Sequence, residues 1–251
     1  MQHKLRDTWA KGAGAVNAWL AIPSPVTAEI AAMQDFDSVT VDLQHGLNDY
    51  QIALSMLQAI STSDKTALVR VPWNEPGIIM KLLDVGALGV ICPMINTRAD
   101  AEAFVGACRY TPEGYRSAGP TRAMLVHGAD YIAKANDAVV TLAMIETKEA
   151  LDNVAEIVAT PGLTGIYVGP SDLSLSLGYG PGMDHTRPEM VDAIMAIRDA
   201  CKAAGVKVGI HCGTTAYARD MIAEGFDLTT ISSDLRAYAA AMGQITTDMR
   251  A

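Results

Sequence analysis

The sequence has few aromatic residues, few charged residues and few cysteines. Of its 251 residues, 6% are aromatic and 19% are charged, whereas half are apolar. A disordered chain shows the reverse balance, because it lacks the apolar surface that offsets the entropy lost on folding. The apolar residues are mostly Ala, Val, Ile, Leu and Met, a mixture that suits buried parallel strands covered by helices. We therefore expect a folded chain with a large core.

The four cysteines show no CxxC spacing and match neither a disulfide framework nor a zinc ribbon. They are Cys92, Cys108, Cys201 and Cys212. This pattern favours the reducing cytoplasm as the location of the protein. Long apolar runs are also missing, since no stretch approaches about 18 uninterrupted apolar residues. Residues 1–12 contain no apolar segment of the signal-peptide kind, so we expect neither a membrane span nor export.

Positive charge is scarce. The chain has 19 Lys and Arg against 28 Asp and Glu, which gives a net charge of −9. A phosphate backbone would repel so acidic a chain, and we therefore expect no nucleic acid partner. The net charge does not exclude an acidic small molecule, because one nearby arginine can outweigh a distant negative field.

Eight short apolar runs bounded by turn residues have the length and composition of strands. They are Ala15–Ile22, Ser38–Leu43, Thr66–Val71, Gly89–Pro93, Val140–Glu146, Gly165–Val168, Val206–Cys212 and Asp227–Ser232. Segments with helical periodicity separate most of them, namely Ala28–Met33, Asp49–Ser61, Pro76–Val85, Asp100–Arg109, Lys148–Ala159, Pro188–Ala204 and Ala216–Glu224. Eight such units predict an α/β fold, a closed (β/α)₈ barrel.

An open, doubly wound sheet is the alternative. It would need a Gly-rich turn after the first strand, where the sequence has the prolines of Ile22–Pro25. No break in composition, repeat or linker divides the chain, so we expect residues 1–251 to form a single barrel domain. One long irregular stretch, Thr111–Asn136, separates the fourth and fifth strands, and loops of that length are usually functional or mobile.

Two carboxylates stand at the ends of predicted strands, where barrels place their active sites. Glu146 ends the apolar run TLAMIE, and Asp172 follows the strand that ends at Val168. A carboxylate at the end of an apolar strand is costly to bury without a cation or hydrogen-bond donors. Two of them suit a hard divalent cation that keeps positions open for water and substrate. The alternative is that each caps the helix that follows it.

Arg70 ends the third strand and His45 follows the second. The guanidinium of Arg70 needs an anionic partner, either a substrate carboxylate or enolate oxygen, or Asp42 on the adjacent strand. The imidazole of His45 has the usual pKa of a general base, and Asp42 or Asp84 could orient it. A surface histidine is the alternative for His45.

The other histidines and the lysines limit which catalytic mechanisms we expect. We expect His3, His127 and His185 at the surface. His211 and Cys212 are adjacent on a strand and point to opposite faces, so only one faces the barrel interior, with His211 a possible supporting group. No lysine stands at a strand end, as a Schiff-base mechanism requires, which favours a metal over an imine. The loops after the seventh and eighth strands lack the Gly-rich run of a phosphate site.

Four segments together resemble the HpcH/HpaI family of class II pyruvate aldolases. They are FDSVTVDLQHGLNDY (Phe36–Tyr50), VRVPWNEP around Arg70, IET (Ile145–Thr147) and VGPSDLSLSLG (Val168–Gly178). The resemblance extends from about Trp9 to Met249. The family includes 4-hydroxy-2-oxoheptanedioate, 2-keto-3-deoxy-sugar-acid and hydroxy keto acid aldolases. The resemblance implies a TIM barrel of the phosphoenolpyruvate/pyruvate superfamily type.

The resemblance also implies an activity, the reversible aldol reaction of a small 2-oxo acid (pyruvate or hydroxypyruvate) with an aldehyde through a metal-stabilised enolate. The metal would be Mg²⁺, Mn²⁺ or Co²⁺. Glu146 and Asp172 match its ligands, Arg70 the group that stabilises the enolate, His45 the base and Asp84 the acid that raises its basicity. The positions that match the substrate-binding pocket are Arg70, Gly169, Pro170, Ser171 and Asp172. The family suggests a homo-oligomer, commonly a hexamer built as a trimer of dimers, in which C-terminal helices swap.

Two residues depart from the family pattern. Relatives often have Gln where this chain has Met144, and Glu where it has Gln44. Both changes alter the polarity around the site and leave the donor and acceptor open, and with Asp42 these residues are candidates for supporting it. A related acyl-CoA lyase of the citramalyl- or malyl-CoA type would need basic anchoring groups, and a non-catalytic keto-acid-binding barrel would lack His45 or Arg70. The segment Gly114–Arg122 could close over the aldehyde, or be a solvated loop or a subunit contact.

Overall fold

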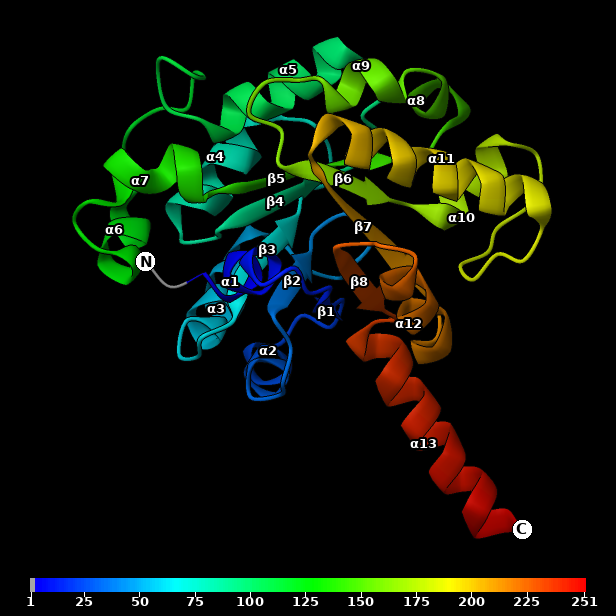
Figure 1. The fold of residues 1–251 in the computed structure, drawn as a ribbon. Helices are drawn as coiled ribbons and strands as arrows, with labels where there is room; N and C mark the ends of the chain where they lie inside the picture. Colours follow the sequence, from blue (N-terminus) through cyan, green and yellow to red (C-terminus); the bar gives the residue numbers. More distant parts are fainter. Residues whose placement is uncertain (1–2) are drawn as a thin grey trace.

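The computed structural model describes residues 3–251 and contains a closed barrel of eight parallel strands (Figure 1). Each strand pairs with the next in sequence, and β8 pairs with β1. The strands are β1 (Ala15–Leu20), β2 (Ser38–Asp42), β3 (Thr66–Arg70), β4 (Gly89–Cys92), β5 (Val140–Ile145), β6 (Gly165–Val168), β7 (Lys207–Cys212) and β8 (Leu228–Ile231). The eight predicted strands are confirmed to within two residues at each end. The closure of β8 on β1 excludes the open doubly wound sheet.

Thirteen helices lie in the described residues, and most of them surround the barrel on the outside. They are α1 (Lys4–Ala10), α2 (Pro25–Ala32), α3 (Tyr50–Ile60), α4 (Pro76–Asp84), α5 (Arg98–Cys108), α6 (Thr121–His127), α7 (Tyr131–Ala138), α8 (Lys148–Asp152), α9 (Val154–Val158), α10 (Pro170–Ser176), α11 (Pro188–Ala204), α12 (Thr215–Ala223) and α13 (Asp234–Arg250). Local signals explain their ends: Thr97 and Asp100 form a capping box at α5, and Gly205 ends α11 with a left-handed φ of 71°.

Two expectations about helices were wrong. The stretch Thr111–Asn136, predicted to be irregular, contains α6 and most of α7, and the predicted helix Lys148–Ala159 is two short helices that meet at Asn153. The short helix α1, at the start of the chain, was not predicted. Leu5 and Trp9 of this helix are buried with side chains of the barrel interior, so α1 closes the amino-terminal end of the barrel.

Alternation along the strands divides the apolar residues into two cores. On β5, Leu142 and Met144 pack inside the barrel, whereas Ala143 and Ile145 pack outward against the helices. The same period of two turns Glu146, the next residue, toward the inside, at the carboxyl end. This alternation brings Glu146 to the end of the barrel where active sites of this fold lie.

The remaining features concern cysteines and the C-terminus. All four cysteines are free and buried. No helix of the described residues is long and apolar enough to cross a membrane. The helix α13 extends away from the barrel and has no buried residue (Figure 1).

Candidate active site

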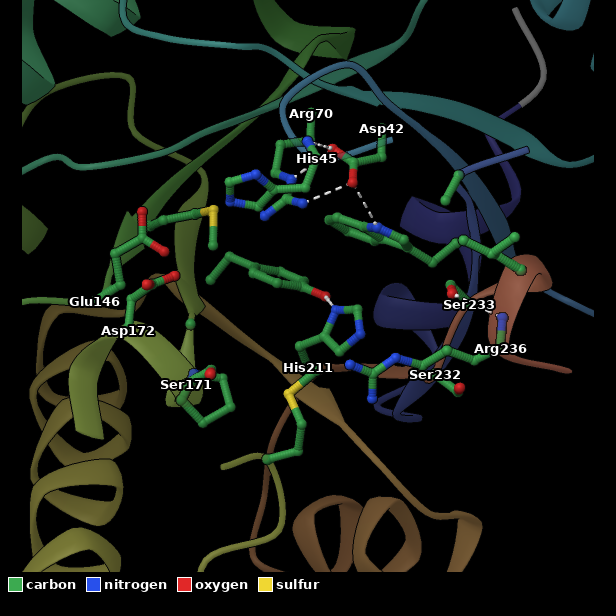
Figure 2. Close-up of a pocket in the computed structure, with 18 residues that line it drawn as sticks. Asp42, His45, Arg70, Glu146, Ser171, Asp172, His211, Ser232, Ser233 and Arg236 are labelled. Atoms are coloured by element: carbon green, nitrogen blue, oxygen red, sulfur yellow. Dashed lines mark hydrogen bonds and ion pairs between the residues drawn. The ribbon is translucent and has the colours of Figure 1, made fainter. Parts of the chain in front are cut away.

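A cavity of about 410 Å³ lies at the carboxyl ends of the strands (Figure 2). Its walls include His45, Arg70, Glu146 and Asp172, which lie at or shortly after the ends of four different strands. The structure therefore brings together four of the five residues predicted to bind metal or to take part directly in catalysis. The fifth, Asp84, lies elsewhere.

Glu146 and Asp172 lie side by side on one wall of this cavity (Figure 2). Glu146 is 2% exposed, and its Oε1 accepts a hydrogen bond of 2.7 Å from the backbone N–H of Met94. The N–H of Met94 can point there because this residue adopts a left-handed φ of 55°. Gly169 is required beside them, since a Cβ on it would lie 2.5 Å from Oε2 of Glu146. Asp172 lies in the first turn of α10.

The surroundings of Glu146 favour the arrival of a cation. Burial raises the pKa of Glu146 to about 7, the hydrogen bond from Met94 opposes this, and the charge of Asp172 adds to it. Proton uptake or a bound cation would relieve the repulsion between the two carboxylates. The described residues offer no cluster of three or more metal-ligating side chains here. Two carboxylates with open positions for water and substrate oxygens still fit Mg²⁺ or Mn²⁺, which bind few protein ligands and keep several waters.

Arg70 and Asp42 form a bidentate pair on the next part of the wall. Arg70 Nε and Nη2 donate to the two oxygens of Asp42 at 2.8 and 2.6 Å, and the guanidinium stacks on Trp19 with 4.8 Å between its carbon and the ring centre. Burial alone would raise the pKa of Asp42, but the hydrogen bonds and charge of Arg70 outweigh it and lower that pKa. The proposed ion pair with Asp42 exists, and Arg70 lines the cavity as well. The two interpretations of Arg70 are therefore compatible.

The loop that carries His45 is held by Asp42. The backbone N–H groups of Gln44 and His45 donate to Asp42 Oδ1 at 3.0 and 3.4 Å. The chain turns so tightly that a Cβ on Gly46 would lie 2.2 Å from the backbone oxygen of Asp42. The imidazole of His45 is exposed to the cavity and lies beside Arg70 (Figure 2). Met144 also lines the cavity, whereas Gln44 does not.

Asp84 does not contact His45 within this chain. It is the last residue of α4, and the chain enters the amino-terminal end of β4 soon after it. His45 follows the carboxyl end of β2, so the two residues lie at opposite ends of the barrel. Asp84 instead accepts a hydrogen bond of 2.7 Å from Arg116. The expectation that Asp84 orients His45 is not met inside the described chain.

The segment Gly114–Arg122 does not close over the cavity. It follows the carboxyl end of α5, at the end of the barrel opposite the site. The side chain of Arg116 is fully buried, and the hydroxyl of Tyr115 donates to the backbone oxygen of Ala103 at 2.7 Å. The hypothesis of a lid was therefore wrong, because these side chains fix the segment to the outside of the barrel.

The three histidines expected at the surface are partly or fully buried. His3 is 8% exposed, and its Nδ1 accepts from the N–H of Arg6 at the start of α1. His127 is half-buried and stacks on Tyr131. His185 is also half-buried, and its Nε2 lies 3.0 Å from the backbone oxygen of Gly182. The expectation was wrong because it assumed that a residue in a predicted loop or terminus is exposed.

Four residues of the cavity were missed or given little weight: Trp19, Tyr167, His211 and Arg236. Tyr167 and Trp19 stack with ring centres 5.7 Å apart, and the Tyr167 hydroxyl lies 3.2 Å from Nδ1 of His211. Burial, with a smaller effect of the Arg70 charge, lowers the pKa of His211 to about 4. The alternation of the strands could have placed Trp19 and Tyr167 inside the barrel. Nothing in the sequence pattern points to Arg236.

Comparisons with known proteins identify the family of the chain. Residues 16–241 match the family model described as HpcH/HpaI aldolase/citrate lyase. The hydroxypyruvate/pyruvate aldolase of Rhizorhabdus wittichii is 45% identical over 249 residues, 99% of each chain. The 5-keto-4-deoxy-D-glucarate aldolase of Shigella dysenteriae is 36% identical over 228 residues, 90% of this chain and 88% of the relative. A solved HpcH/HpaI aldolase/citrate lyase family protein from Burkholderia cenocepacia superposes with a TM-score of 0.92 at 32% identity, covering 99% and 100% of the two chains.

Proposed function

Because the chain belongs to the HpcH/HpaI aldolase/citrate lyase family and is a carbon–carbon lyase, we propose that it is a divalent-metal-dependent aldolase. It joins the enolate of pyruvate or hydroxypyruvate to an aldehyde, and catalyses the reverse cleavage. The observation that carries this proposal is the pair Glu146 and Asp172 on one wall of a cavity that also contains Arg70 and His45. The name of the Rhizorhabdus relative supports the choice of 2-oxo acid.

Glu146 and Asp172 would hold the divalent metal. When bound, it would act as a Lewis acid on the carbonyl oxygen of the 2-oxo acid and would orient that substrate. Ser171 and Asp172, at the start of α10, line the same cavity, and their backbone N–H groups would donate to the substrate carboxylate.

Arg70 would stabilise the negative charge on the enolate oxygen. Only Nε and Nη2 of its guanidinium bind Asp42, so Nη1 keeps donors for the cavity. Asp42 and the ring of Trp19 hold the guanidinium in place before substrate arrives. Such a preorganised donor stabilises charge that develops in the transition state more than charge in the ground state.

His45 would move the proton. In the addition direction, C3 of the 2-oxo acid loses a proton, a bond forms between C3 and the aldehyde carbon, and the aldehyde oxygen gains a proton. His45 is exposed to the cavity beside Arg70, and from there it would pass the proton to that oxygen directly or through a water molecule. In cleavage the same imidazole would accept the hydroxyl proton.

Neither alternative matches the site as well. The described residues around the cavity present two cationic side chains, Arg70 and Arg236, and Arg70 is already paired with Asp42. This wall offers no set of basic residues for the phosphates of an acyl-CoA thioester. A binding protein without turnover would not need both His45 and Arg70.

The helix α13 supports the proposal of a homo-oligomer. It presents a stripe of apolar side chains spaced alternately by three and four residues, and these side chains are 45 to 82% exposed: Leu235, Tyr238, Met242, Ile245 and Met249. Such a stripe is the pattern of a helix that packs against another helix. The hexamer and the cytoplasmic location stay predictions. Light scattering of the wild type and of Met242→Lys would test the role of α13.

The decisive experiment is an assay of aldol cleavage and addition before and after chelation. Pyruvate and hydroxypyruvate are offered with a panel of aldehydes, and Mg²⁺, Mn²⁺ or Co²⁺ is then restored. We expect activity to disappear on chelation and to return with metal. Activity that survives exhaustive chelation would reject the metal site at Glu146 and Asp172, and absence of turnover with any pair would reject the aldolase.

A further inference from the structure

The loop that joins β4 to α5 (residues 93–97) lies beside Glu146, although its own side chains do not line the cavity. The backbone N–H of Met94 in this loop donates to Glu146 Oε1 at 2.7 Å. Gly169 approaches the same carboxylate so closely that a Cβ on it would lie 2.5 Å from Oε2. The carboxylate of Glu146, which Figure 2 shows beside that of Asp172, is therefore held between two segments of backbone.

Met94 directs its N–H at Glu146 from a strained conformation. Its φ of 55° is in the left-handed region, which residues with a Cβ rarely adopt. Such strain persists only where the surrounding structure imposes it. Ile95, the next residue, is fully buried in the core between the barrel and the helices, and Asn96 after it is bonded to the neighbouring loop. The loop as a whole therefore imposes the conformation of Met94.

Asn96 ties this loop to the turn that follows Glu146. Its Oδ1 accepts from Thr147 Oγ1 at 2.5 Å, and its backbone oxygen accepts from Asn153 Nδ2 at 2.9 Å. Thr147 comes directly after Glu146 and caps α8, since its Oγ1 accepts from Ala150 N at 3.0 Å. Asn96 is thus bonded to both ends of α8, the helix that starts next to Glu146.

The far end of the loop is anchored as well. Asp100 of α5 accepts from the backbone N–H of Asn96 at 3.2 Å and from that of Thr97 at 2.9 Å. The backbone oxygen of Asp100 in turn accepts from Asn74, in the loop after β3, at 3.0 Å. The β4–α5 loop is therefore fixed by α5, by α8 and by the loop after β3.

A metal held by only two protein carboxylates depends on how those carboxylates are oriented. Mg²⁺ requires nearly octahedral geometry and keeps several waters, so a misplaced protein ligand is not easily replaced by another. Groups that orient metal ligands through hydrogen bonds typically change metal affinity by about 10- to 100-fold when they are removed. One N–H bond to Glu146 fixes the rotation of the carboxylate and leaves lone pairs for a cation.

We propose that the β4–α5 loop orients Glu146 for the divalent metal, with Asn96 and the left-handed backbone of Met94 as positioning residues. This inference rests on the proposed function, because Glu146 needs this orientation only as a metal ligand. Neither residue touches the substrate. Their effect is therefore expected in metal binding in the absence of substrate.

The first test measures Mn²⁺ affinity by calorimetric titration, together with the denaturation midpoint of the same samples. Asn96→Ala is expected to lower the affinity about 10-fold. Asn136→Ala is the matched control, since Asn136 exchanges backbone hydrogen bonds of 2.7 and 3.0 Å with Tyr110 at the amino end of the barrel. This control should lower the denaturation midpoint and keep the wild-type affinity.

Two variants of Met94 separate the backbone from the side chain. Met94→Gly keeps the N–H and adopts the left-handed φ without strain, so Mn²⁺ affinity should stay within about threefold of wild type. Met94→Val puts a β-branched residue at this φ, which should turn the N–H away from Glu146 and lower the affinity about 10-fold.

Wild-type affinity in both Asn96→Ala and Met94→Val would overturn the inference. An equal loss of affinity in Asn136→Ala would also overturn it, because the loss would then reflect stability and not orientation. A loss in Met94→Gly as large as in Met94→Val would assign the effect to the side chain and reject the role of the backbone. Absence of Mn²⁺ binding by the wild type would instead reject the metal site and with it the proposed function.

Discussion

Two arginine–aspartate pairs, each with a buried arginine, lie at opposite ends of the barrel, and they use the same chemistry differently. At the carboxyl end, Arg70 binds both oxygens of Asp42 and still borders the cavity. At the amino end, Arg116 donates to Asp84 and to the hydroxyl of Tyr131, and stacks on that ring and on Tyr110.

The two pairs differ in how much of each guanidinium is in contact with other protein groups. The side chain of Arg116 is 0% exposed, its contacts are all protein groups, and its Nε is buried without a partner among the described residues. Arg70 has one edge held by Asp42 and another open to the site. A guanidinium fixed on one edge can present donors to a ligand without reorganising, whereas a guanidinium enclosed on all sides can only stabilise the fold.

Breaking the enclosed pair should give the largest effect. Arg116→Ala leaves Asp84 without its partner and empties the space between two tyrosines. We expect a loss of about 4 kcal/mol in the free energy of unfolding, measured by denaturant titration. Arg98→Ala, which breaks the surface pair with Glu102, is the control and should cost less than about 1 kcal/mol. If the two variants were equally stable, the cluster around Arg116 would not stabilise the fold as we infer.

Breaking the open pair should damage the reaction, in addition to the stability lost when Asp42 is left buried without its partner. In Arg70→Ala we expect the activation free energy to rise by about 3 kcal/mol. The value of kcat should then fall more than 100-fold, with a smaller effect on KM. Arg70→Lys keeps the charge but loses the bidentate geometry, so it should recover only part of the rate. Steady-state kinetics of the folded fraction would check this. A near-normal kcat in Arg70→Ala would remove Arg70 from the mechanism.

A variant of Glu146 tests metal binding at the carboxyl end of the barrel separately from the role of Arg70. Glu146→Gln removes one of two metal-binding carboxylates, and we expect the affinity for Mn²⁺ to fall at least about 100-fold in calorimetric titration. Glu149→Gln, an exposed glutamate three residues later on α8, is the matched control. Unchanged affinity in the Glu146 variant would place the metal elsewhere.

A smaller contrast concerns two histidines, one at each end. Burial lowers the pKa of His3 to about 4, as it does for His211. The unfolded chain therefore binds a proton near pH 6.5 before the folded one does, and stability is lost as the pH falls from there toward 4. His3→Asn keeps a capping side chain and should remove on the order of 2 kcal/mol of the stability change between pH 7 and pH 5. Equal pH slopes in wild type and variant would contradict this.

The barrel and four site residues could be predicted because each depends on short-range pattern. The run TLAMIE puts Glu146 at the end of an apolar strand, and barrel closure brings such ends together. The prediction that Asp84 orients His45 is not met within the chain, and the predicted order of helices and strands already contains the reason. A residue in the last turn of a helix lies next to the start of the following strand, at the end opposite the site.

Arg236 and Gly114–Arg122 required three-dimensional information. Which side of α13 faces the cavity depends on how Asp234 ties the helix to β1, a contact across more than 200 residues. The segment Gly114–Arg122 has the glycines of a mobile loop, but the buried side chain of Arg116 and the contacts of Tyr115 hold it in place. Composition cannot reveal such tertiary contacts.

The four buried cysteines can report on local opening of the native barrel. They lie on β4, α5, α11 and β7, and burial raises the pKa of Cys108, Cys201 and Cys212 to about 12. The thiolate is the form that reacts, so the native barrel should resist alkylation and air oxidation. A thiol reagent then modifies only molecules in which the corresponding element has detached. The order in which the four sites react would show which part of the wall separates first.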